Sequence, residues 1–175
     1  MNNDKPVGGE KDGSAWLPPV DGTTTDATLF SNALFDALND CRANNGLPKV
    51  PHSLTMTHVA QAHVADLFDP DRELPYSAAC NPHSWTTGPN MCCYDSYHTN
   101  PGCMWDKPSQ LTGGRYPGAG FEVLMSASGS LDAVEIARRA VTGWAESAPH
   151  RTVILNEAPW SDIFFQALGC SEKHM

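Results

Sequence analysis

Residues 142–156 read TGWAESAPHRTVILN and carry the densest pattern in the chain. A stripe of apolar residues at helical spacing leads into them and predicts a helix: Val134, Ala137, Val141 and Trp144. Ser130 is the predicted cap of that helix, and Pro149 sets its outer limit because proline cannot continue a helix. His150 follows the proline, and residues 151–156 predict one more helical turn.

Two more amphipathic helices are predicted nearer the N-terminus. The first begins at Thr28, with Asp26 as a candidate cap, and stops at Gly46. The second is capped by Ser53 and ends near Pro70. Together with the helix that ends before Pro149, they supply three apolar faces that must be buried against something.

The middle and the end of the chain predict a small sheet. Residues 71–120 show no sustained period, which predicts a long irregular region. Residues 121–125 form a short apolar run that fits a buried strand, and residues 163–168 alternate enough to be a final strand. Helices that flank such a sheet indicate an α/β sandwich.

Length and charge bound the number of domains and the partners. Residues 1–25 are polar and predict a flexible leader or linker, which leaves residues 26–175 as one domain. The net charge of −9 argues against nucleic acid as a partner. No run approaches the roughly eighteen apolar residues of a spanning helix, so we predict no membrane span. The N-terminus lacks the basic-then-apolar layout of a signal peptide.

The six cysteines favour disulfide bonds over a zinc ribbon, because no Cys-x-x-Cys pair is present. The sequence alone leaves their connectivity open. Cys92 and Cys93 are adjacent and would point to opposite sides of an extended strand, so we expect them to have different partners. Disulfide bonds form in oxidising compartments. We therefore expect an extracellular or secreted protein, although this chain shows no signal peptide.

The sequence contains no Gly-x-x-x-x-Gly-Lys phosphate loop, no Gly-x-Ser-x-Gly elbow and no His-Glu-x-x-His metal helix. The candidate functional residues are therefore histidines and carboxylates. His83 and His150 lie in distinctive local settings, each beside a proline. On the residues alone, the favoured interpretation of both is a loop histidine with ordinary hydrogen bonds. Glu122 has a stronger case, because a lone carboxylate in an apolar strand must find a partner or face a cleft. His63 lies on the apolar stripe of the second helix, so we interpret it as a core histidine outside the site.

Four pieces of the chain, in order, resemble the CAP superfamily, which groups cysteine-rich secretory proteins, venom allergens and plant pathogenesis-related proteins. TGWAESAPHRTVILN looks like that family's Trp, Gly-His, Ile-Leu-Asn segment. The other pieces are residues 53–67, which resemble its second helix, residues 83–85, which resemble its histidine-bearing loop, and residues 118–123, which resemble its Gly-Tyr-Gly-Glu strand. Cys93-Tyr94 and residues 104–108 are similar to a microbial branch of the superfamily.

The resemblance implies an α-β-α sandwich in which a small, mainly antiparallel sheet is flanked by helices and braced by disulfides. It also implies an open cleft where two histidines and two glutamates converge. His83, Glu122 and His150 match the family's cleft residues. Glu146 is the candidate for the fourth, but it stands two residues after Trp144 and four before His150, which departs from the family's spacing. The family's sheet usually has a further strand after the segment that matches residues 163–169, and this chain stops at Met175. We therefore expect a truncation, a rearranged sheet edge or a strand supplied by a neighbouring chain.

Three functions are open. The first is a secreted binding or interaction module whose cleft holds a divalent metal, a small ligand, a lipid or a peptide, with a protein partner as a further option. His83 and His150 would then be the ligands of zinc or another divalent cation. The alternative is a zinc-dependent hydrolase in which Glu122 or Glu146 is the general base. In the third, the cleft is vestigial and the fold serves protein contacts.

Overall fold

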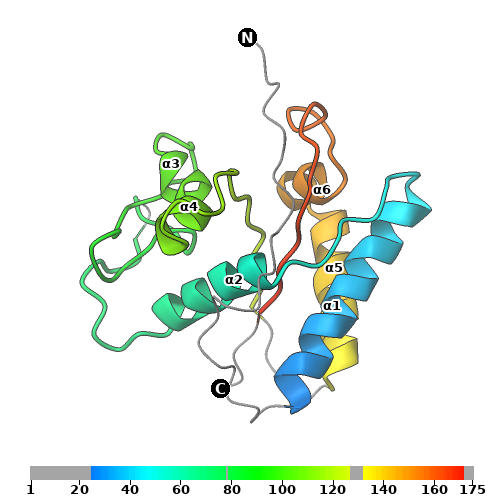
Figure 1. Cartoon of the computed structure of the whole chain (residues 1–175), viewed down its shortest axis with the longest axis horizontal. Coiled ribbons are helices and arrows are strands. Elements are labelled where there is room, and N and C mark those ends of the chain that lie inside the picture. The colour runs from blue at the N-terminus through cyan, green and yellow to red at the C-terminus, as the bar shows by residue number, and fades with distance from the viewer. Residues whose placement is uncertain (1–24, 78, 127–131, 172–175) are drawn as a thin grey trace.

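The computed structural model describes residues 25–77, 79–126 and 132–171. The helices in this part are α1 (Thr25–Asn44), α2 (Leu54–Leu67), α3 (Gly102–Trp105), α4 (Lys107–Leu111), α5 (Ala133–Glu146) and α6 (Ala148–Ile154). In Figure 1, α1 and α5 run side by side, α2 lies across from them, and extended chain passes between. The predicted leader, residues 1–25, lies outside the described residues except for Thr25.

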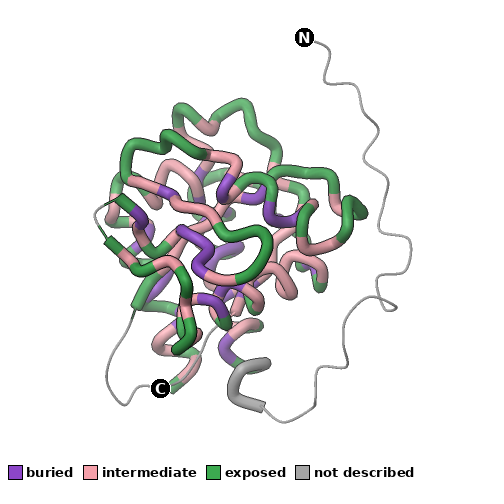
Figure 2. The backbone as a smooth tube through the Cα atoms, turned by 90° about the vertical axis from the view of Figure 1, so that its left-hand side faces the viewer, coloured by how far each residue is buried: buried purple, intermediate pink, exposed green. Residues whose placement is uncertain are grey.

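The main core is the contact between α1 and α5, which α6 and the C-terminal segment complete. Its buried residues are Phe30, Leu34, Leu38, Ala137, Ala140, Val141, Trp144, Ile154, Leu155 and Cys170. Figure 2 shows buried stretches of the backbone toward the middle of the molecule and exposed stretches mostly at its outside. A smaller cluster of Trp85, Tyr94 and Cys103 lies under the irregular region.

The three predicted amphipathic helices are present, but the predicted starts of two of them are wrong. Ser53 caps α2 as predicted, with its hydroxyl accepting from the Met56 amide at 3.2 Å. Helix α1 begins at Thr25, so the predicted cap Asp26 lies inside it. Helix α5 is capped by Asp132, whose carboxylate accepts from the Glu135 amide at 2.9 Å, and the predicted cap Ser130 falls outside the described residues.

The apolar stripe of α5 also begins later than predicted. Ala137, Val141 and Trp144 are buried, as expected, but Val134 is 60% exposed. Ala140 is buried in its place. The buried set therefore follows the i, i+3, i+4, i+7 rule of a helix face, and Val134 in the first turn lies beyond it.

The described residues contain bridge pairs but no strand, so the predicted sheet is not confirmed. Residues 121–126 run as extended chain without ladder hydrogen bonds. The 163–168 segment makes one parallel bridge, in which Leu168 pairs with His52. The physical difference is one of pairing: both segments are extended, but a strand needs a neighbour that exchanges backbone hydrogen bonds along its length.

The C-terminal segment is fixed by its close approach to α2. The Leu168 amide donates to Pro51 O at 2.9 Å, and the Ser53 amide donates to Leu168 O at 2.9 Å. A Cβ on Gly169 would lie 2.0 Å from the Met56 carbonyl carbon. Only glycine fits at this crossing, because no larger residue could approach the α2 backbone so closely.

Two disulfide bonds brace the irregular region. Cys80 pairs with Cys93, and Cys92 pairs with Cys103. The predicted separate partners of the adjacent Cys92 and Cys93 are therefore confirmed. Cys41 and Cys170 are free thiols, so the disulfide interpretation is wrong for these two. Both pack with the main core, where they act as small apolar side chains.

None of the helices among the described residues combines the length and the apolar character that crossing a bilayer requires.

Candidate functional site

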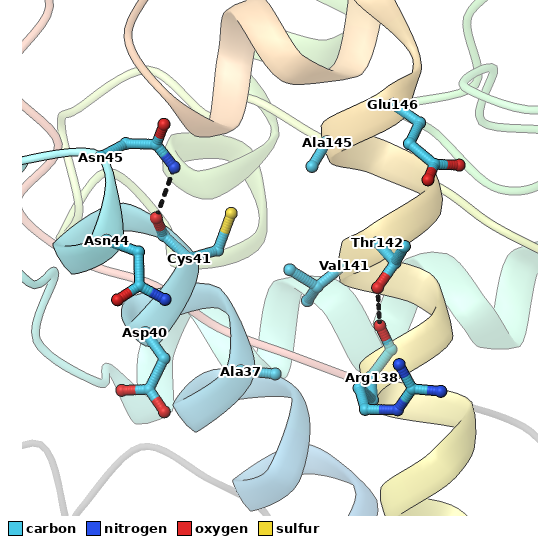
Figure 3. A pocket seen from close by; sticks show the side chains of 10 residues that line it. All are labelled: Ala37, Asp40, Cys41, Asn44, Asn45, Arg138, Val141, Thr142, Ala145 and Glu146. Atoms are coloured by element: carbon cyan, nitrogen blue, oxygen red, sulfur yellow. Dashed lines mark hydrogen bonds between the residues drawn. The ribbon is translucent and has the colours of Figure 1, made fainter.

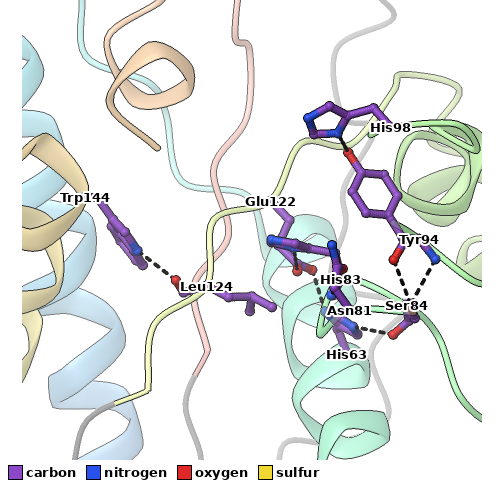
Figure 4. Close-up of polar contacts among 9 residues, drawn as sticks. All are labelled: His63, Asn81, His83, Ser84, Tyr94, His98, Glu122, Leu124 and Trp144. Atoms are coloured by element: carbon purple, nitrogen blue, oxygen red, sulfur yellow. Dashed lines mark hydrogen bonds and ion pairs between the residues drawn. The ribbon is translucent and has the colours of Figure 1, made fainter. Parts of the chain in front are cut away.

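Glu122 lies between two histidines and contacts both. Its Oε1 is 2.8 Å from His83 Nδ1, and its Oε2 is 2.5 Å from His63 Nδ1. Figure 4 shows the carboxylate between the two rings, one from α2 and one from the loop after Cys80. We refer to His63, His83 and Glu122 as the His–Glu cluster. The side chain of Glu122 is 24% exposed, so this carboxylate is largely removed from water.

Two backbone anchors place Glu122. On one side, the Gly120 amide donates to Trp105 O at 3.0 Å, and a Cβ on Gly120 would lie 2.8 Å from Pro108. On the other side, the Trp144 indole donates to Leu124 O at 3.1 Å. The segment is therefore held against the α3–α4 turn at one end and against α5 at the other. Its extended backbone turns Glu122 toward α2, while the next residue packs on the main core.

The loop that carries His83 is fixed by its own hydrogen bonds. The His83 amide donates to Asn81 Oδ1 at 2.9 Å, and the Asn81 amide donates to Tyr94 O at 2.8 Å. The Tyr94 amide donates in turn to the Ser84 hydroxyl oxygen at 2.9 Å. The Cys80–Cys93 disulfide closes the same loop from outside. His83 thus has a defined position although it lies outside helices and strands.

Helix α2 holds the far end of this loop. Asp66 is buried and accepts from the backbone amides of Thr86 and Thr87 at 2.8–3.0 Å, and both threonine hydroxyls also donate to it. Asp66 lies three residues after His63, so the two side chains share a face of α2. One helical face therefore contacts both Glu122 and the loop that presents His83.

His63 is the most deeply buried member of the His–Glu cluster, with 1% of its surface exposed. Its Nε2 lies 3.2 Å from Ser84 O. Its ring stacks on Trp85, with centroids 4.6 Å apart and planes at 23°. The interpretation of His63 as a buried histidine holds, but its main partner is Glu122, so placing it outside the site missed a contact. The signal was present: an imidazole on an apolar stripe must have partners of its own.

His63 and Glu122 shift each other's pKa. Burial acts to lower the pKa of His63, but the hydrogen bond and the negative charge of Glu122 outweigh it and raise the pKa. For Glu122, burial acts to raise the pKa, and the hydrogen bonds from His63 and His83 outweigh it and lower the pKa. Both shifts favour a charged pair, His63 as a cation and Glu122 as an anion.

His150 lies on α6, with its Nδ1 2.8 Å from the hydroxyl of Ser147. Burial lowers the pKa of His150, and the charge on His83 lowers it further. The lowered pKa favours the neutral ring, which is the form that binds metals.

Glu146, the fourth predicted site residue, is not brought into contact with the others. It is exposed and makes no hydrogen bond or ion pair with any residue in the described ranges. It lines a groove of about 550 Å³ between α1 and α5, together with Cys41 and Arg138 (Figure 3). The carboxylate that meets His83 is Glu122 alone among the described residues.

The donor atoms decide which residues could hold a metal ion. Each oxygen of Glu122 contacts one histidine, His63 or His83. The Nε2 atoms of His83 and His150 have no partner among the described residues. No group of three or more His, Cys, Asp or Glu with metal-binding geometry occurs in that part of the chain. The imidazole Nε2 atoms of His83 and His150 are therefore the candidate donor atoms that these residues leave unengaged.

Comparison with known proteins identifies the family. Residues 35–158 match the CAP family, described as the Cysteine-rich secretory protein family. The matched range includes the His–Glu cluster, Glu146 and His150. No curated protein and no solved structure matches the chain. Because the matched range covers well over half of the 175 residues, the chain belongs to the CAP family.

Proposed function

We propose that this chain is a secreted binding module of the CAP family that holds a divalent cation, such as zinc, on Nε2 of His83 and Nε2 of His150. The observation that carries the proposal is the contact of Glu122 with His83 Nδ1 at 2.8 Å. A carboxylate accepts a proton donor, so the His83 proton lies on Nδ1 and the lone pair lies on Nε2. This is the arrangement in which protein carboxylates orient metal-binding histidines.

Two protein ligands leave open coordination positions, which suits binding of a second molecule. A zinc ion held by two imidazoles keeps water in its remaining positions and can exchange it for an oxygen of a small ligand or a peptide. Secretion is supported by the two disulfide bonds, which form in oxidising compartments. We also assign the extended segments between the helical layers to the small sheet of the family's α-β-α sandwich, and the chain to a microbial branch.

The experiment is a calorimetric titration of zinc into metal-free protein. We expect one site per chain, with affinity reduced at least about tenfold by His83→Ala and by His150→Ala. His58→Ala is the matched control, because His58 lies on α2 and makes no hydrogen bond or ion pair with the His–Glu cluster in the described residues. Equal zinc binding by wild type, His83→Ala and His150→Ala would contradict the metal site.

The geometry gives less support to the zinc-dependent hydrolase. A hydrolase of that kind needs a carboxylate free to take a proton from water. Glu122 has both oxygens engaged, and Glu146 lines the groove between α1 and α5. Hydrolysis of a peptide or ester library by the zinc-loaded protein, lost in Glu122→Gln, would favour the hydrolase over the binding module.

A further inference from the structure

We propose that a cavity beside α3 and α4 binds a zwitterionic α-amino acid, with Lys107 on its carboxylate and Asp106 on its ammonium group. The cavity has a volume of about 270 Å³ and lies between residues 89–92 and the α3–α4 segment. It shares no residue with the proposed metal site on His83 and His150. The inference therefore goes beyond the proposed function and does not depend on zinc.

Lys107 supplies a buried ammonium group in the wall of this cavity. The residue is 2% exposed, and no carboxylate of a described residue forms an ion pair with it. Its Nζ donates to Asn90 O and lies 4.9 Å from the centre of the Trp85 ring. An ammonium group has three N–H donors, and Asn90 O is the one hydrogen-bond acceptor that it contacts in the described part of the chain. A carboxylate would supply the partner that a buried cation needs.

The pKa of Lys107 agrees with a cation that lacks a directly bonded anion. Burial lowers this pKa to about 8, although the negative charges of Asp66 and Asp106 act to raise it. A carboxylate placed on Nζ would favour the charged form of the lysine and raise the pKa again.

Asp106 supplies the opposite charge at the rim of the same cavity. It is exposed, and its carboxylate makes no hydrogen bond or ion pair with any residue that the structure describes. The carboxylate lies over Gly102, since a Cβ on that glycine would be 2.9 Å from Asp106 Oδ2. An anion alone would be repelled by Asp106, and a cation alone by Lys107. A zwitterion satisfies both charges, and an α-amino acid carries its two charges on one carbon atom.

The walls of the cavity are held in place before any ligand binds. The Cys92–Cys103 disulfide joins the two walls covalently, and the hydrogen bond from Lys107 to Asn90 O joins α4 to the same segment. Three residues with exposed amide side chains also line the cavity: Asn90, Asn100 and Gln110. Because an amide both donates and accepts hydrogen bonds, we expect a polar side chain on the bound amino acid.

The test is a titration of L-glutamine into metal-free protein, followed by NMR. L-Glutamine carries both charges and a side-chain amide. Two analogues each lack one charge: glutaric acid monoamide lacks the ammonium group, and 4-aminobutanamide lacks the carboxylate. We expect one L-glutamine site per chain, a raised pKa of Lys107 in the saturated protein, and binding of each analogue weaker by at least about tenfold. Absence of L-glutamine binding, or an analogue that binds as tightly, would overturn the proposal.

Two variants assign the charges. We expect Asp106→Asn to weaken L-glutamine binding at least about tenfold without weakening the binding of glutaric acid monoamide. Lys107→Met keeps the buried apolar stem and should weaken both of these ligands without weakening 4-aminobutanamide. Lys49→Met is the matched control, because Lys49 is exposed and lies outside the cavity. Equal losses of all three ligands in Asp106→Asn would overturn the assignment, and this outcome does not require Lys107→Met to fold.

Discussion

Removing a carboxylate from water costs several kcal/mol unless partners replace the lost hydration. Glu122 has two such partners, His63 and His83, and each uses a different oxygen. The charge of Glu122 therefore stabilises the folded state through its contacts with both rings. At the scale of single residues, stability and the proposed metal site depend on the same carboxylate.

Glu122→Gln should lower the free energy of unfolding by about 2–4 kcal/mol, because it removes the charge that contacts both His63 and His83 in a largely buried position. Urea unfolding measures the change. Glu146→Gln is the matched control: it is exposed and without partners in the described ranges, so its effect should stay within about 0.5 kcal/mol. Equal effects of the two substitutions would contradict the assignment of Glu122 to the cluster.

The pH dependence of stability should carry the signature of the pair. The pKa of His63 is raised in the folded state, so its contribution is full below the unfolded value and is lost as pH rises through the folded pKa. The pKa of Glu122 is lowered, so its contribution is present above the unfolded value and is lost as pH falls through the folded pKa. The difference in unfolding free energy between wild type and Glu122→Gln should be largest near about pH 5–7.

Urea unfolding of metal-free protein between about pH 3 and pH 10 measures that difference. His150, whose lowered pKa acts in the opposite sense to that of His63, is present in both proteins and cancels. A difference that stays constant over the whole range would contradict the charged pair.

The sequence predicts Glu122 better than its partner, for a physical reason. A single charged residue in an apolar run cannot be explained by packing alone, because burying its charge is costly without a partner. A histidine on an apolar helix stripe, such as His63, has two explanations, since a core histidine and a paired one look alike in sequence. Glu146 matched a family role by proximity in sequence, but contact with His83 depends on which face of α5 it occupies.

At the scale of elements, two buried polar side chains connect segments that share no ladder. Arg42, at the end of α1, donates to Ile154 O at 2.7 Å and to Asn156 Oδ1 at 2.8 Å, which joins α1 to the end of α6. Asn39 exchanges hydrogen bonds with the Val50 backbone at 2.8 and 3.0 Å, as a neighbouring strand would. These contacts satisfy backbone groups that helix packing alone would leave unpaired.

Gly169→Ala should destabilise the protein by more than about 2 kcal/mol, because the added Cβ would meet the α2 backbone 2.0 Å from Met56 C and 2.1 Å from Thr57 N. Gly143→Ala is the control. Its nearest neighbour would be Met125 Sδ at 4.0 Å, and alanine is the better helix former, so stability should rise by up to about 1 kcal/mol. Thermal unfolding of both variants distinguishes them; a tolerated alanine at 169 would contradict the close crossing.

Helices were easier to predict than the extended segments. Apolar periodicity and a serine cap locate α2 from local sequence alone. The start of α5 was missed because Ser130 and Asp132 are both good caps, and local chemistry does not choose between them. The extended runs have the right composition for strands, but a ladder depends on neighbours distant in sequence, which periodicity does not reveal.

At the scale of the whole molecule, covalent bonds hold the irregular half and the α1–α5 core holds the other. Both disulfides lie between Cys80 and Cys103, a stretch without a helix until α3 begins at Gly102. Composition predicted this division, because residues 71–120 lack the apolar period that would bury a helix face. The connectivity could not be predicted, since it depends on which cysteines the fold brings together.

Counting reactive thiols tests this description. Alkylation of native protein should modify Cys41, which lines the groove between α1 and α5, and spare Cys170, which is 5% exposed and whose pKa burial raises to about 12. Unfolding without reductant should expose both free cysteines, and reduction should expose all six. Mass spectrometry gives the sites. Modification of Cys80, Cys92, Cys93 or Cys103 before reduction would contradict the two disulfides.

The most direct test of the account is an anomalous difference map at the zinc edge, from crystals of the wild-type protein grown with zinc. We predict a peak at about 2.0–2.1 Å from Nε2 of His83 and from Nε2 of His150, with Glu122 still on His83 Nδ1. A peak bonded to Glu122, a peak at other residues, or no peak at these two histidines would contradict it.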